Sequence, residues 1–320
     1  MNSFGENFVF TSFGESHGAA VGGVLDGVPA GIAIDTALIR RELQRRAGVI
    51  DASQPLPVSP RAGREKDEVE WLSGVIERDG ELLTLGTPVA FLIRNTDARP
   101  RDYEWLKHSF RPGHADYTYQ LKYGIRDHRG GGRASARETA ARVVAGCIAR
   151  QRLKEKGITI NASLVQVGEE TRSDRFASLL QEVQLAGDSI GGIVACEVRG
   201  LPAGTGDPLF DKLQARLAFA MMSINGCKGF DYGTGFSRMA ARGSDLYHPD
   251  EVPCPASGGI EGGISNGLPL TFRCVFKPAA TIRQLYGGRH DCCIAVRAVP
   301  VVEAMTALTL CDILCPSRQV

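Results

Sequence analysis

The sequence has almost no excess of charge. Its 320 residues include 37 lysines and arginines against 36 aspartates and glutamates, which gives a formal net charge of +1. A protein this close to neutrality has no bulk electrostatic attraction for nucleic acid or for an anionic membrane surface, so neither is an expected partner. Any anion that the chain binds must therefore be held by a local cluster of basic side chains.

Long apolar segments and cysteine frameworks are also missing. No apolar run approaches the length that crosses a bilayer, and residues 1–10 are polar and acidic, unlike the start of a signal peptide. The nine cysteines are scattered, and no pair has the C-x-x-C spacing of a zinc site. An odd number of cysteines without a framework fits a reducing compartment. We therefore expect a cytoplasmic protein with no membrane segment and no metal site.

The common nucleotide-binding fingerprints are absent as well. Residues 18–23 do not give G-x-G-x-x-G after a strand, and no G-x-x-x-x-G-K-[ST] occurs. No linker or low-complexity tract divides the chain, which is long enough to bury a sizeable core. We expect a single domain over residues 1–320 that has neither a Rossmann nor a P-loop fold.

Apolar patterns predict both helices and strands. The predicted strands cover residues 19–25, 88–94, 158–167, 190–198 and 268–276. The predicted helices run from the cap Asp35 to Gly48, over residues 135–157, from Asp207-Pro208 through Met221, and over residues 301–314. Because helices and strands mix without a steady βαβ rhythm, the pattern predicts an α+β fold rather than a doubly wound sheet.

Glycine is in surplus. Its 38 positions are about 12% of the chain against the usual ~7%. Many fall in five clusters, at residues 14–31, 130–132, 226–235, 258–267 and 287–288. Glycine lets backbone N–H groups approach a ligand closely. Five such loops indicate a site assembled from distant segments, although each loop taken alone reads as an ordinary tight turn.

Arginines stand beside these loops or at helix ends. The five concerned are Arg46, Arg111, Arg133, Arg137 and Arg289. A guanidinium group binds phosphate or carboxylate through paired hydrogen bonds, and the helix start next to Arg133 adds free N–H groups. The set predicts a ligand with several negative charges. For any single arginine the alternative is a surface ion pair, with Asp102, Asp116 or Glu138 as candidate partners.

Three of the six histidines, His17, His114 and His290, lie in the same loops. Histidine can donate or accept a proton near neutral pH, and bound anions favour its charged form, which suits a general acid. The alternative for each is a turn residue bonded to the backbone. No two of the three share a helix turn, which argues against a metal site and a metal-dependent hydrolase.

Three further side chains are candidates for proton transfer. Asp291 is the best carboxylate for base work, and its alternative is an ion pair with Arg289. Ser16 and Ser135 could orient a ligand or relay a proton, and their alternative is helix or turn capping. The residues alone therefore predict a composite anion site with proton-transfer groups.

Four glycine-bearing segments together resemble the signatures of chorismate synthases. They are Gly14-Glu15-Ser16-His17-Gly18, Arg111-Pro112-Gly113-His114-Ala115-Asp116, Gly132-Arg133-Ala134-Ser135-Ala136-Arg137-Glu138-Thr139 and Gly288-Arg289-His290-Asp291. Further matches, in the family's order, are Met222-Ser223-Ile224-Asn225, Gly262-Gly263-Ile264-Ser265 and Lys277-Pro278. The resemblance covers nearly the whole chain, and the motifs are specific as a set although each is weak alone.

The resemblance implies a lyase of the shikimate pathway of aromatic amino acid biosynthesis. Such an enzyme converts 5-enolpyruvylshikimate 3-phosphate to chorismate by anti 1,4-elimination of phosphate and needs reduced FMN. The family fold is a sandwich of helices and antiparallel β-sheets, and the family assembles as a homotetramer. Some members reduce their own flavin with NADPH, and no nicotinamide motif is visible here.

The same resemblance implies a role for individual residues. His17 would protonate the departing phosphate, and His114 would serve the reduced flavin as its proton donor. Asp291, with Ser16 or Ser135, would assist proton removal. The substrate would be held by Arg46, Arg111, Arg137 and Arg289. FMN would be contacted by Arg133, Ala134, Ser135, Asn225, Gly226, Gly262, Lys277, Pro278, Ala279, Ala280, Thr281 and Arg289.

The sequence departs from the family pattern mainly at its periphery. Ala134 replaces a serine, Cys292 stands where proline is usual, and the segment 282–287 is shorter. The central residues remain, namely His17, His114, Arg137 and Asp291. We therefore expect an active enzyme. The alternative is a paralogue that binds flavin or another polyanion without turnover.

Overall fold

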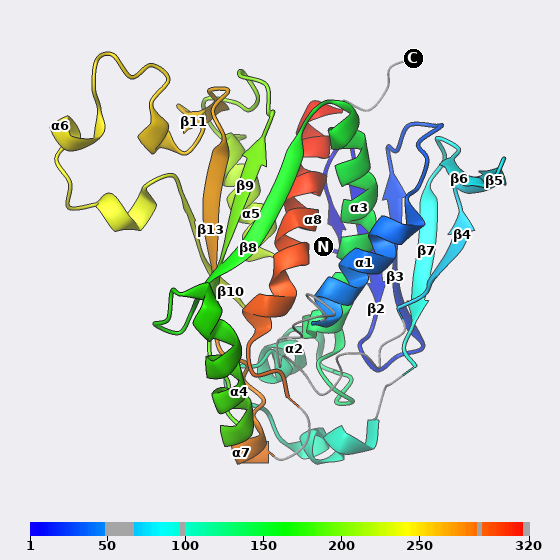
Figure 1. Cartoon of the computed structure of the whole chain (residues 1–320). Helices are drawn as coiled ribbons and strands as arrows, with labels where there is room; N and C mark the ends of the chain where they lie inside the picture. Colours follow the sequence, from blue (N-terminus) through cyan, green and yellow to red (C-terminus); the bar gives the residue numbers. More distant parts are fainter. Residues whose placement is uncertain (49–66, 97–99, 287–289, 316–320) are drawn as a thin grey trace.

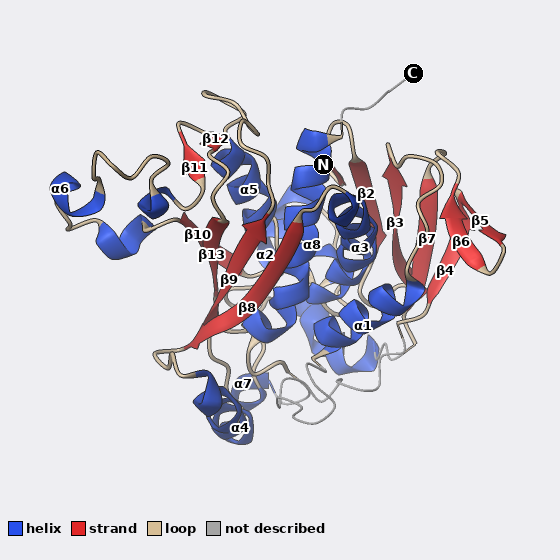
Figure 2. Ribbon diagram, turned by 45° about the horizontal axis from the view of Figure 1, so that its top comes forward, coloured by secondary structure: helices blue, strands red, loops and turns tan. Residues whose placement is uncertain are grey.

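Two antiparallel β-sheets enclose a layer of helices (Figures 1 and 2). The computed structural model describes residues 1–48, 67–96, 100–286 and 290–315. Helix α3 (Thr139–Glu155) packs on the first sheet, helix α8 (Ile294–Leu314) packs on the second, and the two helices pack on each other. The predicted α+β sandwich of helices and antiparallel sheets is confirmed.

The first sheet is built from the N-terminal part of the chain. Its strands, in spatial order, are β1 (Ser3–Phe4), β2 (Val9–Gly14), β3 (Ala20–Asp26), β7 (Val89–Arg94) and β4 (Val69–Ser73). A separate hairpin follows β4, formed by β5 (Val75–Arg78) and β6 (Glu81–Thr84). Along β7 every second side chain is fully buried, at Val89, Phe91 and Ile93. The strands predicted over residues 19–25 and 88–94 correspond to β3 and β7.

The second sheet comes from the C-terminal half. Its strands, in spatial order, are β10 (Cys227–Tyr232), β13 (Leu270–Phe276), β9 (Gly192–Arg199) and β8 (Thr159–Val167). Buried residues pair across the ladder, with Phe272 opposite Cys196 and Cys274 opposite Val194. The three strands predicted in this region are confirmed. A short hairpin adjoins the start of β13, formed by β11 (Ile260–Glu261) and β12 (Ile264–Ser265).

The remaining helices are shorter. The α-helices are α1 (Thr36–Ala47), α2 (Asp116–Tyr123), α4 (Phe176–Ala186), α5 (Leu213–Met222), α6 (Gly243–Leu246) and α7 (Arg283–Tyr286). The 3₁₀ helices are η1 (Pro100–His108), η2 (Gly132–Ala134), η3 (Ala136–Glu138), η4 (Ser173–Arg175), η5 (Gly235–Arg238) and η6 (Pro255–Ser257). Helix α1 has the predicted ends, because Asp35 accepts a hydrogen bond from the Leu38 N–H and Gly48 adopts a φ of 100°.

Two predicted helix starts are wrong. Helix α5 begins at Leu213 rather than at Asp207-Pro208, because Gly206 forms a bridge to Ile264 of the β11–β12 hairpin and residues 208–211 form bends and turns. Helix α8 begins at Ile294 rather than at residue 301 and contains Pro300. A proline inside a helix costs roughly 3 kcal/mol. Burial of the extra turns offsets this cost, at ~1.5–3 kcal/mol for each large side chain such as Val296.

Helix α8 is the central core element. Within the described part of the chain it is the one helix long and apolar enough to cross a membrane, but 94% of that stretch is buried inside the protein. A buried aspartate near its end, Asp312, accepts backbone hydrogen bonds from Glu6, Asn7 and Phe8 at 2.6–2.9 Å. The first strands are thereby fastened to the last helix, and α8 acts as a core helix.

Candidate active site

A cavity lies at the end of the sandwich where helix and strand ends from both halves meet. It has a volume of about 380 Å³ and lies between the end of α1, the start of η3 and α3, the start of β10, the end of β13 and the start of α8. Helix starts present free backbone N–H groups and the positive end of the helix dipole. This arrangement of ends favours an anionic ligand.

Most of the residues expected from the sequence line this cavity. They are His17, Arg46, Arg111, His114, Ala134, Ser135, Arg137, Asn225, Gly226, Lys277, Ala279, Ala280, Thr281 and Asp291. Segments more than two hundred residues apart in the chain therefore meet at one site, as the glycine loops indicated. Arg289 lies outside the described residues.

Four expected residues that the structure describes do not line this cavity, namely Ser16, Pro278, Arg133 and Gly262. Ser16 is buried behind His17, and its Oγ lies 3.0 Å from His17 Nδ1. Pro278 is not among the described residues that line the cavity, although both of its neighbours are. Arg133 donates to Ser12 and to the carbonyl of Gly14, and lines a second hollow of about 760 Å³ that shares His114 with the cavity.

Gly262 is distant from this group. It lies in the turn of the β11–β12 hairpin, which adjoins the start of β13, whereas Lys277 follows the end of that strand. The structure places it away from the cavity that the other expected residues line. The motif that contains Gly262 forms the turn and second strand of this hairpin, and the carbonyl of Gly263 accepts a hydrogen bond from the Leu213 N–H at the start of α5.

One wall of the cavity carries two guanidinium groups joined by a carboxylate. Arg46 Nη2 lies 2.9 Å from Asp67 Oδ2, and Arg137 Nη1 lies 2.5 Å from Asp67 Oδ1. Arg137 also donates to Asn95 Oδ1 at 2.8 Å and to the carbonyl of Arg94 at 3.1 Å. Sequence reasoning missed Asp67, because it lies outside every motif and reaches the site only through the fold.

A second cluster joins Arg111, Asp116 and His114. Both oxygens of Asp116 accept from Arg111 at 2.8 Å, and His114 Nδ1 lies 2.9 Å from Asp116 Oδ1. Burial alone would raise the pKa of Asp116, but hydrogen bonds from Arg111 and His114 outweigh it and hold the pKa well below its usual range. The pairing considered as an alternative for Arg111 is thus present, and His114 Nδ1 faces both Asp116 Oδ1 and Arg111 Nη2, the latter at 3.2 Å.

His17 is held by different partners. Its Nδ1 faces the hydroxyl of Ser16, and its ring meets the ring of Tyr103 edge-on with centroids 4.8 Å apart. Gly130 packs against the imidazole so closely that a Cβ at this position would overlap it. Glycine is therefore required at this position, because the His17 ring lies against its backbone. His17 and His114 line the same cavity but are held by different neighbouring residues.

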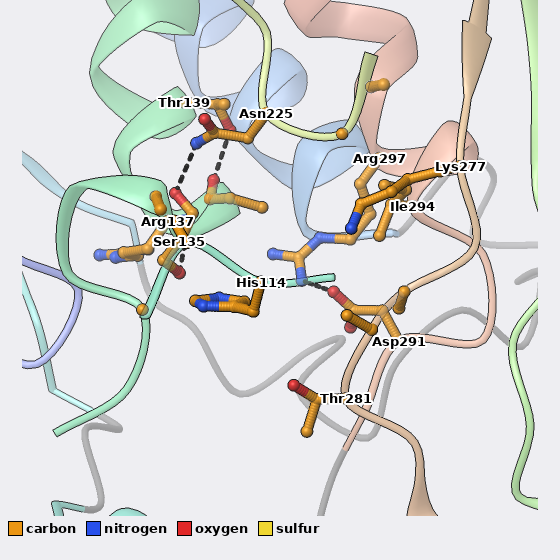
Figure 3. A pocket seen from close by; sticks show the side chains of 18 of the residues that line it. His114, Ser135, Arg137, Thr139, Asn225, Lys277, Thr281, Asp291, Ile294 and Arg297 are labelled. Atoms are coloured by element: carbon orange, nitrogen blue, oxygen red, sulfur yellow. Dashed lines mark hydrogen bonds and ion pairs between the residues drawn. The ribbon is translucent and has the colours of Figure 1, made fainter. Parts of the chain in front are cut away.

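Asp291 faces a residue that sequence reasoning missed, Arg297. In Figure 3 the guanidinium of Arg297 points at the carboxylate, with Nη1 2.9 Å from Asp291 Oδ2. Arg297 is 6% exposed, and its Nε donates to the carbonyl of Arg46 at 2.9 Å, near the end of α1. The sequence offered one clue, because the single arginine of a mostly apolar helix needs a carboxylate or carbonyl partner when it is buried.

The remaining wall combines amide, hydroxyl and ammonium groups. Asn225 donates to the carbonyl of Ser135 at 2.9 Å, and Ser135 Oγ accepts the Arg137 N–H, so Ser135 caps η3 as expected (Figure 3). Burial and the charge of neighbouring Lys228 lower the pKa of Lys277. Because the two ammonium groups repel each other, an anion beside them is favoured.

No group of three histidine, cysteine, aspartate or glutamate side chains that could hold a metal ion occurs among the residues that the structure describes. The cysteines are all free thiols. The arginines and lysines that line the cavity are groups that can bind anions, and His17, His114 and Asp291 are groups that can exchange protons.

Comparison with known proteins places this site in a family. The sequence profile described as chorismate synthase matches residues 8–315. Chorismate synthase of Christiangramia forsetii is 44% identical over 353 aligned positions, covering 97% of this chain and 96% of that protein. The Porphyromonas gingivalis protein of the same name is 46% identical, with 99% and 96% covered. A crystal structure of chorismate synthase superposes with a TM-score of 0.74 at 30% identity, covering 97% of this chain and 92% of the other. The chain belongs to the chorismate synthase family.

Proposed function

We propose that the chain converts 5-enolpyruvylshikimate 3-phosphate to chorismate and inorganic phosphate, in the shikimate pathway, by an anti 1,4-elimination that requires reduced FMN. The carbon–oxygen bond to phosphate and one ring carbon–hydrogen bond break, and a second ring double bond forms without net redox change. The observation that carries the proposal is a single cavity in which buried guanidinium groups face two histidines with separate partners.

The leaving phosphate needs a proton donor and cations around it. We assign the proton to His17, which lines the cavity and whose Nδ1 is engaged by Ser16. Arg46, Arg111 and Arg137 line the same cavity and suit the phosphate and the two carboxylates of the substrate. Arg289 is assigned to the substrate and to FMN from its motif alone.

The second histidine has a different task in this proposal. Asp116 accepts from His114 Nδ1, so the ring presents Nε2 as its remaining site for proton exchange. We assign His114 to the bound flavin, and Asp291 with Ser135 or Ser16 to removal of the ring proton. Arg297 fixes the carboxylate that this step would use.

The residues present fit FMN. Ala134, Ser135, Asn225, Gly226, Lys277, Ala279, Ala280 and Thr281 line the cavity, and we assign them to the cofactor together with Pro278, whereas Arg133 would reach it from the adjoining hollow. The ammonium groups of Lys277 and Lys228 provide charge for its phosphate. When bound, reduced FMN supplies electron density to the substrate as phosphate leaves. Gly262 would contact FMN only if the hairpin moved toward the cavity.

We also infer one domain over residues 1–320, a homotetramer and a cytoplasmic location. Helix α8 packs between elements of both halves, which supports one domain. The free cysteines fit a reducing compartment. The segment around α6 projects from the body (Figure 1) and exposes apolar side chains, including Met239 at 82% and Val252 at 84%, as subunit contacts would. Light scattering should give four times the chain mass of 34.4 kDa.

One assay tests the proposed reaction. Purified protein, 5-enolpyruvylshikimate 3-phosphate and chemically reduced FMN are mixed without oxygen, and chorismate is measured. We expect turnover that depends on the flavin. FMN binding without chorismate formation would favour the non-catalytic paralogue instead. NADPH with oxidised FMN, in place of the chemically reduced flavin, measures whether the chain reduces its own cofactor.

His17→Ala serves as the control for the assigned roles in this assay. It should slow chorismate formation by about 100-fold or more, the usual contribution of a positioned acid, while FMN binding stays within about twofold. Equal losses in turnover and in FMN binding would show that His17 holds the flavin rather than the phosphate.

A further inference from the structure

We propose that Asp67 is a positioning residue for substrate binding. Its carboxylate holds the guanidinium groups of Arg46 and Arg137 side by side, so that the two form one preformed anion-binding surface. The inference deepens the proposed function and rests on it, because it concerns how that site receives its anionic substrate.

The geometry of the bridge is specific. Each oxygen of Asp67 takes one arginine, with Oδ2 2.9 Å from Arg46 Nη2 and Oδ1 2.5 Å from Arg137 Nη1. The three residues come from separate segments, namely the end of α1, the chain just before β4 and the 3₁₀ turn η3. A single carboxylate therefore sets the relative position of two arginines that are otherwise held by different elements.

The two guanidinium groups are buried, so their positive charges favour a carboxylate between them. The side chains of Arg46, Asp67 and Arg137 are 0%, 4% and 9% exposed. Two buried guanidinium groups repel each other strongly when no anion lies between them, because little water is present to screen the charge. Asp67 lowers this repulsion, because each of its oxygens lies next to one of the two guanidinium groups.

The position of Asp67 relative to the cavity separates positioning from direct contact. Both arginines are among the described residues that line the cavity, whereas Asp67 is not among them. Arg137 is further oriented by Asn95 and by the carbonyl of Arg94, and Arg46 by the carbonyl of Ala136 at 3.4 Å. The carboxylate therefore acts through the arginines, which reach the ligand.

The bridge also sets the charge of this wall. Two guanidinium groups and one carboxylate leave the cluster with one net positive charge. An incoming carboxylate or phosphate meets donors that are already oriented, so less of its binding energy is spent on ordering side chains. Loss of the bridge should therefore weaken substrate binding more than it slows the chemical step.

Asp67→Asn tests this, because it keeps the shape of the side chain and removes the charge. We expect the KM for 5-enolpyruvylshikimate 3-phosphate to rise by about tenfold or more, with kcat changed by less than about threefold, since positioning is lost rather than chemistry. Binding of reduced FMN should stay within about twofold of wild type. Glu70→Gln is the matched control, because Glu70 lies on adjacent β4 in an exposed pair with Arg94 and should leave KM unchanged.

A double mutant shows whether Asp67 acts through Arg137. In an Arg137→Lys background the bridge is already altered, so adding Asp67→Asn should raise KM by less than about threefold. A purely structural role for Asp67 would give the same factor in both backgrounds. Asp67→Glu keeps the charge and moves it by one methylene, and it should raise KM by about threefold or more because the geometry matters. If Asp67→Asn does not fold, the KM of Asp67→Glu tests whether Asp67 positions the two arginines.

Three results of these KM measurements would overturn the inference. A wild-type KM in folded Asp67→Asn, or in Asp67→Glu, would overturn the inference, as would an equal effect of Glu70→Gln. A lower KM in Asp67→Asn would also overturn it, because Asp67 would then compete with the substrate. Failure of the wild-type protein to form chorismate is a separate outcome, which removes the proposed function itself.

Discussion

At the scale of single residues, the cavity arginines are matched with aspartates. Asp67 joins Arg46 and Arg137, Asp116 pairs with Arg111, and Asp291 pairs with Arg297. Buried cations of this kind require a partner before any ligand arrives. The aspartates therefore keep the site stable in its empty form and fix the directions of the donors that the ligand will meet.

Asp116 gives a pH dependence of stability with a definite sign. Its pKa in the folded protein is below the ordinary value. Its ion pair therefore stabilises the folded state fully above about pH 4, and this contribution is lost as the pH falls through the folded pKa. We expect Asp116→Asn to lower the free energy of unfolding by about 3–5 kcal/mol at pH 7, the range for removing one partner of a buried pair.

The difference between wild type and Asp116→Asn should shrink by about 1 kcal/mol between pH 7 and pH 3, because the unfolded aspartate becomes protonated in this interval. Urea denaturation of both proteins across this range measures it. A difference that stays constant or grows toward pH 3 would contradict the assigned pKa direction.

The sequence predicted the cavity residues that lie within motifs and missed those that do not. His17, His114 and Ser135 were predicted because glycine loops and a helix start carry them. Asp67 lies 21 residues from Arg46 and 70 from Arg137, and no local pattern links the three. Pairing across such separations depends on the order of the layers, which periodicity does not contain.

At the scale of elements, the crossing of α3 and α8 depends on a glycine. Gly146 of α3 lies against Ala304 of α8, and a Cβ built on Gly146 would overlap both the Cα and the Cβ of that alanine. Two helices can approach this closely only where one of them lacks a side chain. The many alanines among residues 134–149 are consistent with close packing, but they do not identify the position that forms the contact.

Gly146→Ala should destabilise the protein although alanine is the better helix former. The helix gains about 1 kcal/mol in propensity, whereas forcing the backbones apart costs about 1–3 kcal/mol, so we expect a net loss of stability. Gly243→Ala is the control, because a Cβ there meets only Tyr247 at 3.9 Å, and it should change stability by less than about 0.5 kcal/mol. Chemical denaturation measures the free energy of unfolding of both variants. A Gly146→Ala protein that is more stable than wild type would contradict the close crossing of α3 and α8.

Predicted strands were more reliable than predicted helix starts, for a physical reason. The strands of both sheets bury one face, so their sequences alternate visibly, as at Phe272, Cys274 and Phe276. The starts of α5 and α8 depend on tertiary contacts, a hairpin in one case and complete burial around Pro300 in the other. Local signals such as Asp207-Pro208 cannot report such contacts.

At the scale of the whole molecule, one carboxylate connects the second sheet with two helices of the middle layer. Glu303 of α8 accepts from the Ala162 N–H on β8 at 2.9 Å, from Arg45 on α1 at 2.8 Å and from Arg150 on α3 at 3.0 Å. It therefore reaches the second sheet and two helices at once. The layer order that makes this possible was predicted only through the family resemblance, because a helix buried on all sides has no amphipathic pattern to orient it.

We expect Glu303→Gln to lower the free energy of unfolding by about 3–5 kcal/mol, because it removes a buried carboxylate that pairs with two partly buried guanidinium groups. Glu197→Gln is the matched control, since Glu197 forms an exposed pair with Arg199 on β9 and should contribute less than about 1 kcal/mol. Urea denaturation of both variants measures the difference.

Glu42 also contacts Arg45 and Arg150, so a loss below about 1 kcal/mol in Glu303→Gln would show that Glu42 alone balances their charge. Because Glu303 does not line the cavity, its loss should lower stability while the KM for substrate stays at the wild-type value, which separates the central network from the Asp67 bridge.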